Sequence, residues 1–103
     1  MPAPTLADLE NRDVTMRIRA IKWAGEKQLA EATPLLVDRL EEQDPAVRFF
    51  AIMALEKITG TKRGYDYQAD AASRAAAAAR WREALAQTPG GPAENTAGGR
   101  GGS

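Results

Sequence analysis

Few side chains in this sequence could perform catalysis or bind a metal. The 103 residues include no His and no Cys, so the chain lacks the commonest general base and any thiolate metal site. Its two serines, Ser73 and Ser103, have no imidazole to activate them. Acid and base chemistry would have to rest on carboxylates alone. We therefore expect a protein that is not an enzyme and that has no metal, cofactor or catalytic residue.

The charged residues balance, with 14 basic and 14 acidic side chains. A chain without net charge has no overall field that attracts nucleic acid or an anionic membrane. Two small basic groups stand out; they are Arg12, Arg19 and Lys22, and Arg74, Arg80 and Arg82. Because the overall charge is zero and acidic residues interrupt the basic ones, we expect no nucleic-acid site.

The sequence predicts neither a targeting signal nor a membrane span. Its N-terminus lacks the basic segment and the apolar segment that a signal peptide requires. The longest strongly apolar run, residues 49–55, is far shorter than the roughly 20 residues that cross a bilayer. We expect a cytoplasmic protein that does not contact membranes.

One pattern of residues occurs twice along the chain. Five residues recur in type 31 positions later: Leu9 as Leu40, Asp13 as Asp44, Arg17 as Arg48, Ala20 as Ala51 and Ile21 as Ile52. A fixed period of this length is typical of stacked repeats, in which each unit buries its apolar face against its neighbours. The repetition predicts a fold whose role is to present a surface.

Helix signals divide the chain into parts. Asp13, Thr33 and Asp44 are predicted N-caps, and Gly60 is a predicted helix stop. The expected helices cover residues 14–26, 34–42, 45–59 and 69–87, after the end of an earlier helix at 5–11. No stretch alternates with the period of a strand, so we expect no sheet. The predicted organisation is an N-terminal segment with a partial repeat helix (1–12), repeats (13–60), a Tyr-containing loop with an Ala-rich capping helix (61–87), and a disordered Gly-rich tail (88–103).

The motif Asp-x-x-x-Arg-x-x-Ala entering one helix, with Pro-Leu-Leu-x-x-x-Leu in the next, resembles the HEAT repeat. The spacing is similar to the short bacterial variety related to phycobilin-lyase repeats. The resemblance implies an all-α solenoid, a right-handed stack of about two and a half helical hairpins plus a C-terminal capping helix. It also implies structural roles for four residues: Asp13 and Asp44 as helix caps, and Arg17 and Arg48 as ties between adjacent repeats.

The segment around Tyr65, with Trp81 on the following helix, resembles the C-terminal closure of short stand-alone HEAT-repeat proteins. Trp81 and Leu85 lie four residues apart, on one helix face. We expect these side chains and Tyr67 to cover the open end of the stack, which makes Trp81 structural. An aromatic ligand cage is the alternative.

The repeat pattern fails at two positions on one helix face. Phe50 and Met53 stand where the first repeat has Arg19 and Lys22. The expected reason is that the Ala-rich helix covers them. The alternative is an exposed apolar patch, which would mark a partner site or a contact between copies of the chain in a homo-oligomer.

Stacks of this kind typically bind through the ridge of their second helices. The matching residues here are Asp38, Arg39, Glu41 and Glu42. An acidic ridge suits a basic peptide or a Lys/Arg-rich protein surface, while an ordinary solvated face is the plainer interpretation. We therefore expect a scaffold for protein–protein interaction with a protein partner of unknown identity. The alternative function is phycobilin-lyase-like chromophore handling or nucleic-acid binding, which a deep aromatic-lined cleft near Tyr65 and Trp81, or a basic stripe, would favour.

Overall fold

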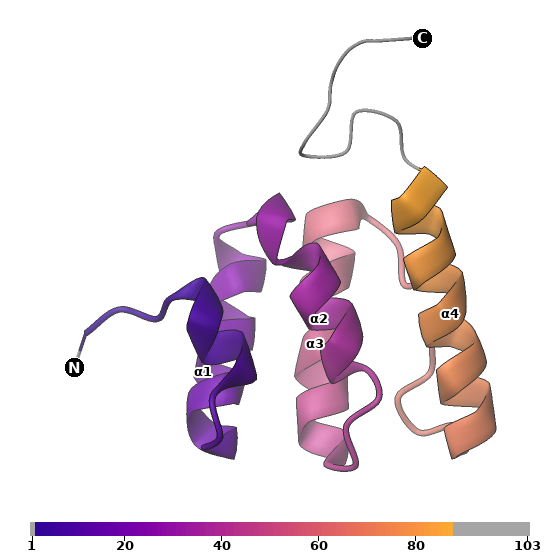
Figure 1. Ribbon diagram of the computed structural model, residues 1–103, viewed down its shortest axis with the longest axis horizontal. Helices are drawn as coiled ribbons and strands as arrows, with labels where there is room; N and C mark the ends of the chain where they lie inside the picture. Colours follow the sequence, from indigo (N-terminus) through magenta and orange to yellow (C-terminus); the bar gives the residue numbers. More distant parts are fainter. Residues whose placement is uncertain (1, 88–103) are drawn as a thin grey trace, which may run out of the picture.

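The computed structural model describes residues 2–87, and these residues form helices joined by short loops (Figure 1). In chain order the helices are the 3-10 helix η1 (Leu6–Glu10), α1 (Val14–Glu26), the 3-10 helix η2 (Ala30–Ala32), α2 (Thr33–Arg39), α3 (Pro45–Thr59) and α4 (Ala71–Gln87). Residues 2–87 contain no strand, which confirms the all-α prediction. None of these helices combines the length and the apolar character that a membrane crossing requires. The predicted disordered tail, 88–103, lies outside the described residues.

The helices form two layers. α1 and α3 pack side by side and make one layer. The other layer is η1, α2 and α4, because α2 contacts both η1 and α4, and Figure 1 shows α1 and α4 on opposite sides of the α2–α3 pair. Across the layers, η1 contacts α1 and α2 contacts α3. η1, α2 and α4 therefore follow one another along the second layer, which is the order of second helices in a short α-solenoid.

The two helices of the first layer begin in the same way. The carboxylate of Asp13 accepts a hydrogen bond from the backbone N–H of Thr15 (2.9 Å), and that of Asp44 accepts one from the N–H of Ala46 (2.8 Å). Each bond satisfies an N–H group that has no partner within its helix. α3 ends at Gly60, whose φ of 85° is left-handed and is adopted readily only by glycine.

Thr33 does not cap α2, so that prediction is wrong. The 3-10 turn Ala30–Ala32 leads directly into α2, and Thr33 already has helical dihedral angles (φ −53°, ψ −50°). Ala32 is the N-cap and offers no side-chain bond. Pro34 still fits in the first turn, where a backbone N–H would have no intrahelical partner.

One apolar core lies between the layers. The largest fully buried side chains are Leu9, Ile21, Leu36, Val37, Leu40, Val47, Leu55 and Trp81. Full burial of an apolar side chain of this size contributes about 1.5–3 kcal/mol. Because these residues come from η1 and from all four α-helices or their ends, the core holds each of them in place.

α1 and α3 approach most closely at Gly25 and Ala54. A Cβ atom on Gly25 would lie 2.9 Å from both Cα and Cβ of Ala54, well inside the optimal contact distance of about 3.5–4.0 Å between carbon atoms. Near the same ends of the helices, Gln28 Nε2 donates to the carbonyl of Lys57 (2.9 Å). Two small residues and one polar contact therefore fix the spacing of the first layer.

The connector between α3 and α4 is held by its aromatic neighbours. The Tyr65 hydroxyl donates to the carbonyl of Leu40 (2.6 Å), and Trp81 Nε1 donates to the carbonyl of Lys62 (3.1 Å). Tyr65 and Trp81 are buried, and Leu85 packs partly against the core. These side chains close the end of the core and leave no open aromatic cage at Trp81.

α4 does not cover Phe50 and Met53, so the expected reason for their apolar character is wrong. α4 lies against α2 in the layer of second helices. Phe50 and Met53 are half-buried and line a groove that contains residues of α1 and α3 but none of α4. The connector after α3 returns the chain to the second layer, where α4 forms a helical hairpin with α3.

Candidate interaction surface

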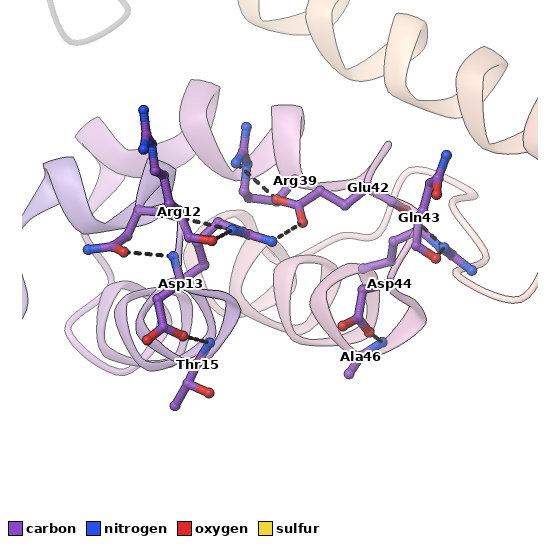
Figure 2. A network of polar contacts seen from close by, with 11 residues as sticks. Arg12, Asp13, Thr15, Arg39, Glu42, Gln43, Asp44 and Ala46 are labelled. Carbon is purple, nitrogen blue, oxygen red and sulfur yellow. Dashed lines mark hydrogen bonds and ion pairs between the residues drawn. The ribbon is translucent and has the colours of Figure 1, made fainter.

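Arg17 joins the two repeats through its guanidinium group. Figure 2 shows its partners Arg12 and Glu42 near the helix caps Asp13 and Asp44. Nη1 donates to the carbonyls of Asn11 (2.7 Å) and Arg12 (3.1 Å), in the loop before α1. Nη2 donates to Oε1 of Glu42 (2.8 Å), in the loop before α3. The other oxygen of Glu42 lies 2.9 Å from Nη1 of Arg39 in an ion pair. Arg17 thus ties its own loop to the next repeat through a carboxylate shared by two arginines.

Arg48 makes the equivalent contacts 31 residues later. Its Nη1 donates to the carbonyls of Glu42 (2.8 Å) and Gln43 (2.7 Å), in the loop before α3. Its Nε donates to the carbonyl of Tyr67 (3.0 Å), so the connector after α3 takes the place that the Glu42 carboxylate has for Arg17. Arg48 is only 7% exposed, and a buried guanidinium is tolerated when such partners satisfy it.

The two-layer stack, the two Asp helix caps and the matching bonds of Arg17 and Arg48 are typical of a helical repeat protein. A family model described as HEAT repeats matches residues 3–88 of the chain. The chain belongs to the HEAT-repeat family. No curated protein matches it, and no solved structure does. In this HEAT-repeat chain, the repeated side chains Asp13, Arg17, Asp44 and Arg48 are bonded to helix starts, to loops or to the next repeat. They belong to the scaffold.

The predicted acidic ridge is paired within the HEAT-repeat chain. Arg82 of α4 forms ion pairs with Asp38 (Nη2 to Oδ1, 3.0 Å) and with Glu41 (Nη1 to Oε2, 2.5 Å). The bond to Glu41, followed by the bond to Asp38, raises the pKa of Arg82 above its ordinary value. Arg39 and Glu42 pair with each other. These ion pairs connect α4 with α2, and each of the four side chains of the ridge already has a partner of opposite charge.

A groove lies between α1 and α3, in the other layer. Its volume is about 180 Å³, and a cavity of about 150 Å³ is large enough to bind benzene. We call it the α1–α3 groove, and its lining residues are Lys22, Gly25 and Glu26 of α1 and Phe49, Phe50, Met53, Ala54 and Lys57 of α3. It has room for one large apolar side chain of a partner.

Aromatic side chains stand along the α3 side of this groove. Phe49 is 37% exposed, whereas Phe50 and Met53 are half-buried. The Phe49 ring packs edge to face against Phe50 (centroids 5.3 Å apart) and against Tyr67 of the connector (5.2 Å), an arrangement that aromatic rings prefer. Clustered apolar side chains that remain open to solvent are typical of interaction sites.

Basic side chains lie at the rim of the α1–α3 groove. Nζ of Lys22 lies 5.5 Å from the centroid of the Phe50 ring, within the range of a cation–π contact. Lys57 lines the groove from α3. Neither ammonium group forms an ion pair with another residue of the described part of the chain. Glu26 is the single carboxylate among the lining residues, so the rim carries a net positive charge.

The predicted basic groups do not combine into a stripe. Three of their arginines donate to backbone carbonyls: Arg19 to Pro2 (2.8 Å), Arg74 to Ala69 (2.6 Å) and Arg80 to Arg63 (3.4 Å). Arg82 pairs with the ridge, while Arg12 is exposed. Most of these guanidinium groups are therefore used within the fold.

The other predicted sites are also internal. Trp81 is fully buried, and burial is the main cause that raises the pKa of Tyr65 above its ordinary value. A hollow of about 250 Å³ beside Tyr65 and Tyr67 is lined also by Phe49 but not by Trp81. Within residues 2–87, no group of three or more His, Cys, Asp or Glu residues gathers as metal ligands would.

Several groove residues were not predicted from the sequence, and the most exposed aromatic one is Phe49. Its counterpart in the first repeat is Ile18, which is also apolar, so the repeat pattern does not fail at this position. The available signal was the four-residue spacing of Phe49 and Met53, which places both on one face of a helix.

Proposed function

We propose that this HEAT-repeat chain is a non-enzymatic protein-interaction module that binds a protein partner through the α1–α3 groove. The observation that carries the proposal is the cluster of exposed Phe49 and half-buried Phe50 and Met53, all of which line the groove. HEAT repeats commonly serve as scaffolds for protein interaction, and this supports the broad class of function.

The groove is a better docking surface than the acidic ridge. A basic partner at the ridge would compete with Arg82 for Asp38 and Glu41. At the groove, a partner would bury apolar surface without breaking any ion pair, and such burial contributes about 25 cal/mol per Å². The proposal therefore moves the binding surface from the second helices to the first.

Affinity capture with matched variants tests this proposal. Phe49→Glu places a charge on the most exposed ring of the cluster, and Arg12→Glu changes an exposed residue outside it as a control. We expect the wild type and Arg12→Glu to capture the same protein from cells of the source organism, and Phe49→Glu to lose it while melting like the wild type. Capture of the same proteins by all three chains would contradict the proposal.

Chromophore handling and nucleic-acid binding receive no support from a specific observation. The hollow beside Tyr65 and Tyr67 does not include the buried Trp81, so the predicted cleft between Tyr65 and Trp81 does not form within residues 2–87. Three arginines of the basic groups are bonded to backbone carbonyls, so these groups make no basic stripe.

A further inference from the structure

We infer that the segment bound in the α1–α3 groove is an acidic peptide that inserts one large apolar side chain. This inference rests on the proposed function, because it names the chemistry of the partner at the same site.

The shape of the groove indicates that the partner inserts one apolar side chain, which we call the anchor. Gly25 and Ala54 form a floor without protruding side chains, since the two helices nearly touch there. Phe50 and Met53 line the groove from α3. A space of about 180 Å³ holds a single ring or a branched aliphatic group.

The charge at the rim of the groove indicates that the bound segment is acidic. A docked partner would take water from the ammonium groups of Lys22 and Lys57, which have no ion-pair partner among the described residues. Carboxylates on the partner would offset that loss, whereas basic residues would add repulsion. Because Glu26 compensates only one of the two lysines, an acidic segment is favoured over a neutral one.

Neither residues 88–103 nor the acidic ridge of a second copy fits the groove well. The residues after Gln87 contain no large apolar side chain, so they cannot supply the anchor. In a second copy, the acidic residues of the ridge, Asp38, Glu41 and Glu42, are already paired with arginines. A separate protein with free carboxylates beside an apolar residue fits the groove better.

The test uses three fluorescein-labelled synthetic peptides of equal length and the full chain. The first peptide is rich in Glu with a central Phe-Leu pair, the second replaces every Glu by Lys, and the third replaces Phe-Leu by Ser-Ser. Fluorescence anisotropy gives the affinity of each peptide for the wild type, Lys57→Glu, Phe49→Glu and the control Arg12→Glu. Sedimentation of the unlabelled chain over the same concentrations reports self-association.

We expect the acidic apolar peptide to bind the wild type at least about tenfold more tightly than either of the other peptides, as removal of a central anchor usually produces. Lys57→Glu and Phe49→Glu should each weaken it by a similar factor, and Arg12→Glu should leave it unchanged. Three outcomes would each overturn the inference. The basic peptide could bind as tightly as the acidic one or more tightly, the affinity could be unchanged in Lys57→Glu and Phe49→Glu, or the chain could occupy its own groove by forming a dimer. If a cellular partner depends on Phe49 while the acidic apolar peptide binds no more tightly than the other two peptides, the inferred acidic segment is wrong. The proposed function then stands.

Discussion

Single side chains explain why the repeated residues are part of the scaffold. Arg48 donates to three backbone carbonyls in two loops, although it is almost completely buried. Arg17 makes the matching bonds in the first repeat. The repetition at a fixed interval singles out these arginines in the sequence, and the resemblance to the HEAT repeat implies that they are structural. The sequence could not indicate that Glu42 and the Tyr67 carbonyl would be the partners, since those contacts depend on how the loops fold.

We predict that Arg48→Ala lowers the free energy of unfolding by about 3 kcal/mol, because the lost bonds are charge-assisted and partly buried. Arg48→Lys should restore little of it, since an ammonium group cannot reproduce the planar fork. Urea denaturation followed by circular dichroism measures both. Arg12→Ala, at an exposed site, should stay within about 0.5 kcal/mol of the wild type. An Arg48→Ala chain as stable as the wild type would show that these bonds are not needed.

Gly25→Ala should destabilise the chain by about 1–3 kcal/mol, because the added methyl group would overlap Ala54 and push the two helices apart. At an unhindered helical position the same change would stabilise by about 0.5–1 kcal/mol. The sign of the change in melting temperature therefore shows whether the added methyl group is accommodated. A stabilised variant would mean that α1 and α3 are packed less closely than in the structure.

At the scale of helices, the sequence predicted where most elements lie but not how all of them pack. Asp and Pro before a helix and Gly after it are local signals, so α1 and α3 could be placed correctly. α4 was expected, but its layer was not, because an Ala-rich helix has a weak apolar pattern and its position depends on the path of the connector. The sequence indicates Thr33 as a cap because the 3-10 turn before α2 has no clear sequence signal.

Asp70 gives a pH-dependent prediction for the start of α4. Its carboxylate accepts a bond from the backbone N–H of Ser73 (2.7 Å), and this bond, followed by one from the Ser73 side chain, lowers the pKa of Asp70 below its ordinary value of 3.8. The folded chain thus binds this proton less tightly than the unfolded chain. The stability that Asp70 contributes is complete above pH 3.8 and is lost as the pH falls through the lower folded-state value. Carboxyl NMR titration should give a midpoint below 3.8, and a midpoint above it would show that the bonds from Ser73 do not stabilise the carboxylate.

The docking of α4 should depend on its buried ring more than on its exposed ion pairs. We predict that Trp81→Ala costs about 3–5 kcal/mol, because it leaves a cavity in the core. Arg82→Ala should cost less than about 1 kcal/mol, since both of its ion pairs are close to half exposed. Chemical denaturation compares the two variants, and equal losses would mean that the ridge ion pairs matter more than exposed pairs usually do.

At the scale of the whole molecule, the two layers of helices present different surfaces. The layer of second helices holds paired charges that connect α2 with α4. The layer of first helices leaves an apolar groove, and the two lysines at its rim form no ion pair within residues 2–87. The sequence pointed to this surface through Phe50 and Met53, where the repeat pattern breaks. It could not show which layer was free, because the ion pairs of Arg82 join residues more than forty positions apart.

Amide shifts of the nitrogen-15-labelled chain, recorded while the protein captured by the wild type is added, test most directly whether the first-helix layer is the binding surface. We predict that the changes concentrate in residues 22–26 and 49–57, which line the α1–α3 groove. Changes confined to residues 34–42 and to α4 would place the partner on the acidic ridge and contradict the proposed function.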